Sequence, residues 1–209
     1  MKLWLQALSM LERHGKCISV KIRHIHPKHL VEVPERRWYL SLLNEEDDVL
    51  DLGCGTGTNT ELVAGICHSA IGMDRETFTP KRYNVGSVGR DITKPLPFRT
   101  GQFHVVLFFD VIEHLYERDR RAVLDEIHRV LMRGGRLIVS APNRDTSWRR
   151  RLRAAGLFSY SDPDHKIEYA RGELLTELAA AGFAPVEPVR PIVYDTPWAG
   201  LIDLIGGVS

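Results

Sequence analysis

The sequence predicts an α/β fold: a Rossmann-like, doubly wound sheet, mostly parallel with a terminal antiparallel strand, plus an N-terminal helix and an insertion after the fifth strand. Three observations predict it. From residue 47 onward short apolar runs alternate with helical stretches, a glycine-rich turn follows the first run, and acidic residues follow several of them. Strands of a parallel sheet are continuously apolar because helices cover both faces.

The apolar runs place five strands in chain order. They are expected at Val49–Leu52, Ala70–Met73, Tyr83–Val85, His104–Phe109 and Arg136–Ser140. Before the last strand, Val123, Ile127 and Val130 recur at helical spacing, and Gly134-Gly135 is expected to stop that helix. A further helix over 172–181 and a strand pair within 186–193 complete the prediction.

Composition narrows the class of protein. The chain has 209 residues, 44% of them apolar, which suits one domain over 1–209. Its 28 basic and 27 acidic residues nearly cancel, so no nucleic-acid partner is expected. Cys17, Cys54 and Cys67 are odd in number and lack zinc-type spacing, which favours a reducing cytoplasm.

The N-terminus resembles neither a signal peptide nor a membrane span, so no stable membrane insertion is expected. Trp4, Leu8 and Leu11 recur at helical spacing, which predicts an amphipathic helix over residues 2–13. We expect it to pack on the domain. A lid over the site and peripheral contact with a membrane are the alternatives.

The turn after the first expected strand is a candidate ligand loop. Gly53, Gly55 and Gly57 alternate as G-x-G-x-G, whereas the dinucleotide fingerprint is G-x-G-x-x-G and a triphosphate loop would continue with Gly-Lys-Ser/Thr. Glycine lets the backbone approach a ligand closely. A tight turn without any ligand is the simpler interpretation of such a loop.

Three acids accompany this loop. Asp51 lies inside the first expected strand, Asp74 ends the second, and Asp91 follows the third, all toward the carboxyl edge of the sheet. Buried acids without partners are unfavourable, so three at one edge indicate a ligand that donates hydrogen bonds. An ammonium group, a ribose diol and an adenine amine together would supply such donors.

These residues carry a resemblance to a known family. VLDLGCGTG at 49–57, IGMD at 71–74, RDI at 90–92, DVIEHL at 110–115 and LMRGG at 131–135 resemble the ordered motifs of class I S-adenosylmethionine-dependent methyltransferases. The resemblance covers about residues 45–185. It is closest to the methyltransferase-11 branch that includes ubiquinone-biosynthesis methyltransferases.

The resemblance implies S-adenosyl-L-methionine as the cofactor, S-adenosyl-L-homocysteine as its product, and a role for each matching position. Asp51, Gly53, Cys54 and Gly55 would face the methionine part, Asp74 the ribose, Asp91 and Ile92 the adenine, and Asp110 the sulfonium end. Local structure alone could also account for three residues of these motifs. Gly57 would serve helix packing, Cys54 would be a small filler, and Asp110 would cap the following helix.

His114 is the candidate catalytic base, because imidazole titrates near neutral pH and this residue follows the fourth strand. A helix cap or a hydrogen bond to Glu113 would account for it equally well. The ubiquinone branch associates magnesium with an acid-x-x-Glu-His segment, matched by Asp110, Glu113 and His114. Because this segment offers at most two carboxylates, no metal is expected. A histidine group, His24, His26 and His29, also suggests a metal only weakly.

The acceptor is expected to be a small molecule. The Asp/Asn-Pro-Pro-Tyr/Phe segment of many nucleic-acid methyltransferases is missing, which favours a hydroxyl oxygen of a metabolite, a quinone-like lipid or a saccharide precursor. An enzyme acting on RNA or protein, and a non-catalytic S-adenosylmethionine-binding protein, are the alternatives. The oligomeric state cannot be inferred from the sequence.

The single domain is expected to consist of four segments: a helical or lid segment at 1–44, the cofactor-binding core at 45–142, the substrate-side insertion at 143–170 and the C-terminal helix and strands at 171–209. Within the insertion a basic run beside Trp148 could bind an anion or form a solvated helix face; it comprises Arg149, Arg150, Arg151 and Arg153. Later in it, His165, Glu168 and Tyr169 could contact substrate or only bond within their loop.

Overall fold

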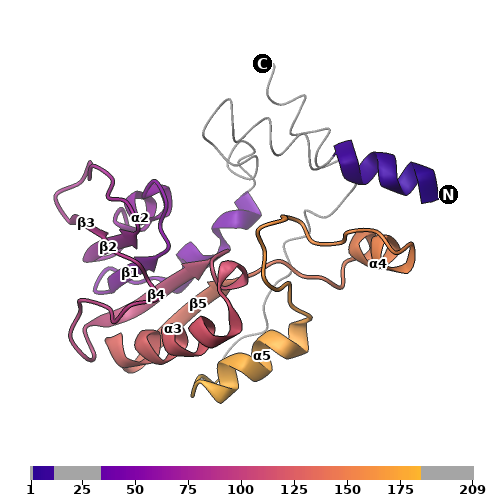
Figure 1. Cartoon of the computed structure of the whole chain (residues 1–209). Coiled ribbons are helices and arrows are strands. Elements are labelled where there is room, and N and C mark those ends of the chain that lie inside the picture. Colours follow the sequence, from indigo (N-terminus) through magenta and orange to yellow (C-terminus); the bar gives the residue numbers. More distant parts are fainter. Residues whose placement is uncertain (1, 12–33, 185–209) are drawn as a thin grey trace.

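The computed structural model describes residues 2–11 and 34–184. The histidine group at 24–29 and the strand pair expected within 186–193 lie outside the described residues. The centre of the molecule is a five-stranded parallel sheet in the order β3-β2-β1-β4-β5 (Figure 1). Its strands are β1 (Asp48–Leu52), β2 (Ser69–Asp74), β3 (Val85–Gly89), β4 (Phe103–Phe109) and β5 (Leu131–Ser140).

This strand order confirms the predicted Rossmann-like α/β class. The chain runs outward from β1 to β3, then returns to the other side of β1 for β4 and β5. The order therefore reverses between β1 and β4, and such a switch point is where doubly wound sheets bind ligands, at the carboxyl ends of the strands.

Helices cover both faces of the sheet because alternate strand residues point to opposite sides. The helical segments are η2 (Pro34–Leu42), α2 (Thr58–Val63), η3 (Ile112–His114), α3 (Glu117–Val130), α4 (Ser147–Ala154) and α5 (Arg171–Ala180). On one face Val106 and Phe108 of β4 pack with the apolar side of α3 and with α5. On the other face Val105 and Leu107 pack with η2 and α2.

The third strand lies further along the chain than predicted. It was expected at Tyr83–Val85, but β3 runs from Val85 to Gly89 and Tyr83 is fully exposed. Glycines are uncommon in strand interiors, and Gly86 and Gly89 disguise this edge strand in the sequence. The shift moves the end of the strand to within two residues of Asp91.

The helix before the last strand ends earlier than predicted. We expected Gly134-Gly135 to stop it, but α3 ends at Val130 and β5 begins at once with Leu131. Pairing of β4 with β5 shifts register between Phe103 and Val105, and Gly134 in the facing strand has φ 78°. The two glycines therefore accommodate an irregularity within the strand instead of ending the helix.

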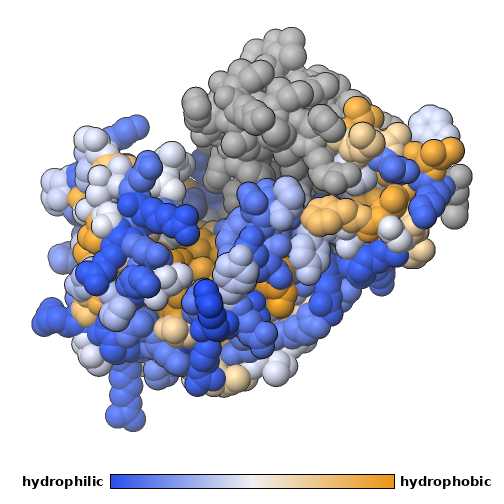
Figure 2. Space-filling view, viewed as in Figure 1, coloured by the Kyte–Doolittle hydropathy of each residue, from blue (hydrophilic) through white to orange (hydrophobic). Residues whose placement is uncertain are grey.

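The N-terminal helix forms over the described residues 2–11, but its apolar side is largely exposed. Leu3 and Trp4 are 81% and 75% exposed, and Figure 2 shows hydrophobic side chains gathered where this helix and α4 lie. The expectation that the helix packs its apolar stripe on the domain is therefore wrong for these residues. In the part of the chain that the structure describes, no helix has the length and apolar character needed to cross a membrane.

The insertion after β5 carries α4 and a long loop, and then returns to the sheet. Asn143 and Tyr169 form an isolated parallel bridge that closes the segment at its base. Trp148 and Leu152 of α4 are buried. The helix α4 thus buries its apolar side chains, and the insertion is anchored next to the carboxyl end of β5.

Candidate functional site

The glycine-rich loop has an unusual backbone conformation. Gly53, Gly55 and Gly57 all have positive φ, at 80°, 54° and 77°. The loop is tied to β2 by a hydrogen bond from the Gly53 N–H to the Met73 carbonyl, at 2.8 Å. A residue with a side chain is strained in this region by roughly 1–2 kcal/mol, so the loop depends on glycine at each position.

The three glycines differ in what surrounds them. A Cβ on Gly53 would lie 2.3 Å from the Val111 side chain, and one on Gly57 would lie 2.5 Å from Phe78. A Cβ on Gly55 would meet nothing within 4 Å. Gly53 and Gly57 are therefore required by internal packing, whereas Gly55 borders open space at the carboxyl edge, where a ligand could approach the backbone.

Asp51 is buried beneath this loop. Its carboxylate accepts a 2.7 Å hydrogen bond from the Thr60 hydroxyl. Burial, and secondarily the charge of Asp74, raise the pKa of Asp51 from 3.8 to about 6, although the Thr60 bond opposes this shift. The fold therefore holds a carboxyl group in an environment that disfavours its charge, and a cationic ligand group would relieve that penalty.

Asp74 joins the loop to the end of β2. Its Oδ2 accepts a 2.8 Å hydrogen bond from the Gly55 N–H, and its Oδ1 accepts one from the Arg75 N–H at 2.6 Å. The side chain is only partly buried. In a phosphate-binding loop, backbone N–H groups point at the phosphate. Here the Gly55 N–H donates to the Asp74 carboxylate instead, so the loop is not arranged to bind a phosphate.

Asp91 and Ile92 lie beyond β3. The Asp91 carboxylate accepts hydrogen bonds from the Thr93 N–H and hydroxyl, at 2.9 and 2.8 Å. These bonds hold the pKa of Asp91 below its ordinary value. Ile92 is partly buried and packs against the core cluster on the α3 face. Together they supply a charged acceptor beside an apolar surface.

Asp110 directly follows β4 and has the one positive φ, 53°, of a described residue other than glycine. Its Oδ1 accepts a 2.9 Å hydrogen bond from the Ser140 hydroxyl, and its N–H donates to the Ser140 carbonyl. Backbone strain in a non-glycine residue is typical of functional sites. Val111, not Asp110, is the N-cap residue of η3.

Cys54 lies between the acids, and its thiol is held in the neutral form. Burial first, and then the charges of Asp51 and Asp74, raise the pKa of Cys54 to about 12. Only the thiolate is a good nucleophile, so this cysteine is not suited to covalent catalysis. Its Sγ would lie 2.9 Å from a Cβ on Gly72, which fits a small filler at the base of the loop.

The region beyond the carboxyl end of β4 is built by η3 and the insertion. Glu113 is 1% exposed, whereas the neighbouring His114 is exposed. The Glu113 carbonyl accepts hydrogen bonds from the N–H groups of Lys166 and Ile167, at 2.7 and 3.3 Å. The loop that carries His165 is thereby seated on η3, directly beyond the carboxyl end of β4.

His165 lies between two carboxylates. Its Nδ1 is 2.9 Å from Glu168 Oε1, and its Nε2 is 4.0 Å from Glu113 Oε1. Burial alone would raise the pKa of Glu168, but hydrogen bonds from His165 and Ser161 hold it below its ordinary value. The ring of His114 packs edge-on against that of His165, with centroids 4.8 Å apart.

The basic run of the insertion divides into internal and exposed members. Arg149 is 3% exposed and donates to the Tyr160 carbonyl, and Arg153 pairs with Asp145 at 3.2 Å. Arg153 is nevertheless exposed, as are Arg150 and Arg151. The run is therefore not one continuous basic face, and half of it serves the structure of the insertion.

Several residues that position the site were not predicted. Thr60 binds Asp51, Ser140 binds Asp110, and Glu177 accepts bonds from Arg120 and Tyr169 at 2.7 and 2.8 Å. Thr60 could have been proposed from its place one helical turn after the glycine loop. Nothing local in the sequence signals the Glu177 contacts, which join α3, the end of the insertion and α5.

Comparison with known proteins agrees with this geometry. The methyltransferase domain family model matches residues 50–139. A Mycolicibacterium smegmatis protein named "Probable S-adenosylmethionine-dependent methyltransferase" is 34% identical over 161 residues, or 75% of this chain and 58% of that protein. The chain thus spans somewhat over half the length of this relative.

Solved structures share the fold. A SAM-dependent methyltransferase from Archaeoglobus fulgidus has a TM-score of 0.61 at 21% identity, covering 91% of this chain and 90% of that one. A Burkholderia thailandensis 1,6-didemethyltoxoflavin-N1-methyltransferase, crystallised with 1,6-didemethyltoxoflavin and S-adenosylhomocysteine, has a TM-score of 0.55 at 22% identity, covering 71% and 65%.

The family-model match and the 34% identical relative confirm the resemblance to class I S-adenosylmethionine-dependent methyltransferases that the motifs indicated, and the solved structures confirm the fold. Residues 50–139 are the part of the chain that matches the methyltransferase-11 domain model. The motifs that carried the resemblance lie almost entirely inside this matched segment, together with the loop, Asp74, Asp91 and Asp110.

Proposed function

We propose that this protein transfers the methyl group of S-adenosylmethionine to a hydroxyl oxygen of a small-molecule acceptor, such as a metabolite, a quinone-like lipid or a saccharide precursor. The observation that carries the proposal is the open space beside Gly55, whose N–H bonds to the partly exposed Asp74, with Asp51 buried beneath the same loop. Acids there suit a ligand with cationic and hydroxyl groups and disfavour one that presents phosphates.

The residues fit the cofactor in chemical type. In this assignment Asp51, Gly53, Cys54 and Gly55 border its methionine part, and Asp74 accepts hydrogen bonds from the ribose hydroxyls. Asp91 and Ile92 hold the adenine, one as a hydrogen-bond acceptor and one as an apolar surface. Asp110 places a carboxylate near the sulfonium. The cofactor supplies an electrophilic methyl group, and the chain supplies binding and alignment, which can account for much of the rate of an in-line displacement.

We assign the acceptor side to η3 and the 143–170 insertion. His114 is exposed beside the buried Glu113, and we propose that it assists loss of the acceptor's hydroxyl proton. The 1,6-didemethyltoxoflavin-N1-methyltransferase, which has the same fold, was crystallised with 1,6-didemethyltoxoflavin and S-adenosylhomocysteine, which supports a small-molecule acceptor. The near-neutral net charge, +1, supports it too, since polyanion binding usually relies on a positive field.

Calorimetric titration of the purified protein with S-adenosylmethionine and S-adenosylhomocysteine tests the cofactor, with NAD as the control ligand. We expect both sulfur nucleotides to bind in the micromolar range and NAD not to bind. Binding of NAD alone would overturn the proposal. A screen of hydroxylated acceptors with methyl-labelled cofactor then tests transfer itself.

Substitution of Asp74 tests the assignment of the ribose. Asp74→Ala is expected to weaken cofactor binding by about 1–3 kcal/mol, because charge-assisted hydrogen bonds are lost. Asp125→Asn is the matched control, since Asp125 is an exposed carboxylate on α3 that pairs with Arg121. Unchanged affinity in Asp74→Ala would show that Asp74 is not a cofactor ligand.

A further inference from the structure

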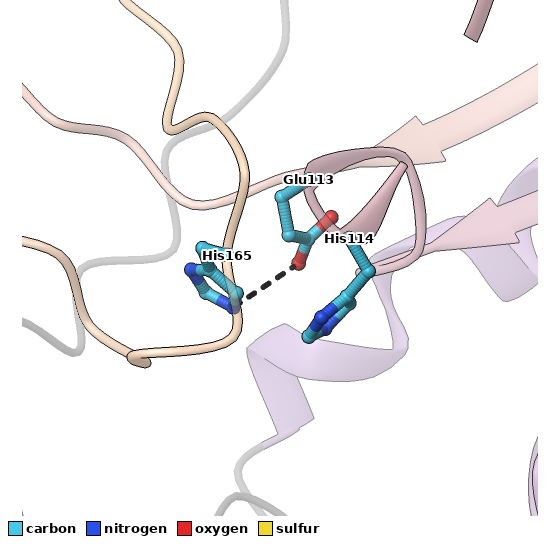
Figure 3. Close-up of side chains that lie close together, drawn as sticks. All are labelled: Glu113, His114 and His165. Atoms are coloured by element: carbon cyan, nitrogen blue, oxygen red, sulfur yellow. Dashed lines mark ion pairs between the residues drawn. The ribbon is translucent and has the colours of Figure 1, made fainter. Parts of the chain in front are cut away.

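The acceptor side contains a cluster of nitrogen and oxygen donors that the cofactor assignment does not use. Glu113 and His114 come from η3, and His165 comes from the insertion loop (Figure 3). One ligand-type atom from each residue lies within 4.8 Å of the corresponding atoms of the other two. The side chains therefore converge on a common point from two segments that are distant in the sequence.

The spacing at this point is wider than a direct contact. His165 Nε2 and Glu113 Oε1 are 4.0 Å apart, which exceeds hydrogen-bond distance. Two donors bound to the same tetrahedral ion, at bond lengths of about 2.0–2.1 Å, lie roughly 3.3 Å apart. A contraction of less than about 1 Å would bring this pair to that distance. The exposed side chain of His114 is the member with most room to adjust.

Glu168 prepares His165 for such a role. Its Oε1 accepts from Nδ1 of His165 at 2.9 Å and from the Ser161 hydroxyl at 2.6 Å. A proton on Nδ1 leaves Nε2 with its lone pair directed toward Glu113. Metal-binding histidines commonly have their second nitrogen held by a carboxylate in this way, which fixes the tautomer and the ring orientation.

The charges of the cluster support a bound cation. Glu113 and Glu168 are each 1% exposed, and the positive charge of Arg149, which is 3% exposed, acts on Glu168. The arginine balances one of the two carboxylates. A lone pair of His165 facing the other carboxylate would be repulsive, and either a proton or a metal ion between them removes the repulsion. The third donor, His114, favours the metal ion.

We propose that Glu113, His114 and His165 bind a first-row transition dication, with zinc as the leading candidate, and that Glu168 is the positioning residue of this site. Two imidazoles and one carboxylate suit zinc, iron or nickel, whereas magnesium requires an oxygen shell. The expectation of no metal came from Asp110, Glu113 and His114 alone. The structure binds Asp110 to Ser140 instead and supplies His165 as the third donor.

Three protein ligands leave a coordination position open, as in catalytic metal sites. An acceptor hydroxyl in that position would lose its proton more easily, because a divalent ion stabilises the oxygen's negative charge. His114 would then assist deprotonation as a ligand of the ion and not as the base, and the hydroxyl proton would leave to solvent water. This use of the ion rests on the proposed function, whereas the binding of the ion does not.

The test is a zinc titration of the untagged full chain after removal of metals with EDTA and dialysis. We expect one equivalent of zinc by calorimetry and by elemental analysis, with magnesium unable to compete. Cobalt should bind at the same stoichiometry and give the visible absorption of a low-coordinate site. Absence of zinc binding by protein that binds S-adenosylmethionine would overturn the inference.

Variants locate the ion. His114→Gln, the exposed ligand and thus the least disruptive change, and His165→Gln should each weaken zinc binding by at least about 100-fold. Glu168→Gln should weaken it by about 10–100-fold, the effect expected of a carboxylate behind a ligand. His68→Gln is the matched control, because His68 pairs with Asp48 on the surface, and it should bind zinc normally.

Folding and the proposed function are controlled separately. Circular dichroism of each variant checks folding, and cofactor titration in the presence of EDTA should give wild-type affinity. Zinc binding that persists unchanged in both His114→Gln and His165→Gln would place the ion elsewhere and refute the site. The protein could instead bind zinc, lose it in these variants and fail to bind S-adenosylmethionine. That result would refute the proposed function but support the metal site.

Discussion

The two sides of the candidate site are built in different ways. The cofactor side is assembled from loops that directly follow β1, β2, β3 and β4, and its contacts run between neighbouring strands, as from Gly55 to Asp74. The proposed acceptor side joins η3 to a loop of the insertion, and its centre is a set of buried charges around His165. One side depends on backbone conformation, and the other on charge pairing.

This difference shows which substitutions each side should tolerate. A loop that needs positive φ accepts few residues other than glycine, but it contains few charges to unbalance. A buried charge cluster has ordinary backbone geometry, but removal of one partner leaves another charge buried. The following predictions test this contrast, from the largest expected effect to the smallest.

Gly53→Ala should be the most damaging change on the cofactor side. It combines a φ of 80° with a Cβ placed 2.3 Å from Val111, so we expect a loss of about 3 kcal/mol in the free energy of unfolding. Cofactor binding should be lost as well. Urea denaturation and calorimetry measure the two effects. A stability close to wild type would show that the loop readily adopts another conformation.

Glu177→Ala should be the most damaging change among the residues that support the proposed acceptor side. It removes the partner of Arg120, which is 8% exposed, and the acceptor of the Tyr169 hydroxyl. We expect the free energy of unfolding to fall by about 2–3 kcal/mol, with cofactor affinity retained. A drop in cofactor affinity of similar size would mean that the two sides are coupled rather than separate.

Asp51→Asn should stabilise the protein while weakening the cofactor site. The folded-state pKa of Asp51, about 6, lies above its ordinary 3.8, so its contribution to stability is fully present below about pH 4 and is lost as the pH rises through about 6. The variant should therefore gain about 1–2 kcal/mol near neutral pH. Denaturation between pH 4 and 7 measures it, and the exposed Asp125→Asn should retain the wild-type pH dependence.

Gly55→Ala and Gly134→Ala form a matched pair with the smallest expected effect. Both glycines have positive φ, 54° and 78°, and a Cβ on either would meet nothing within 4 Å. Each substitution should therefore lower the free energy of unfolding by about 1 kcal/mol, from backbone strain alone. Only Gly55→Ala should weaken cofactor binding. Equal cofactor affinity in the two variants would contradict our placement of the ligand beside Gly55.

The same contrast explains what could be predicted from the sequence. The strands next to the cofactor and the loop after β1 were predictable, because a continuous apolar run and a spaced set of glycines are local signals. The glycine-containing β3 was misplaced because its composition is that of a turn. The convergence of His165 on Glu113 and His114 was not predicted, since it depends on how the insertion folds back after β5.

The main-chain contact between the insertion and η3 allows the side chains of the insertion loop to change during evolution. The two hydrogen bonds to the Glu113 carbonyl are donated by the main-chain N–H groups of Lys166 and Ile167. Main-chain donors are the same for every residue except proline. Side chains at these two positions can therefore be exchanged while the loop keeps its position on η3, so under the proposed function a new acceptor preference can arise here without any change in the sheet.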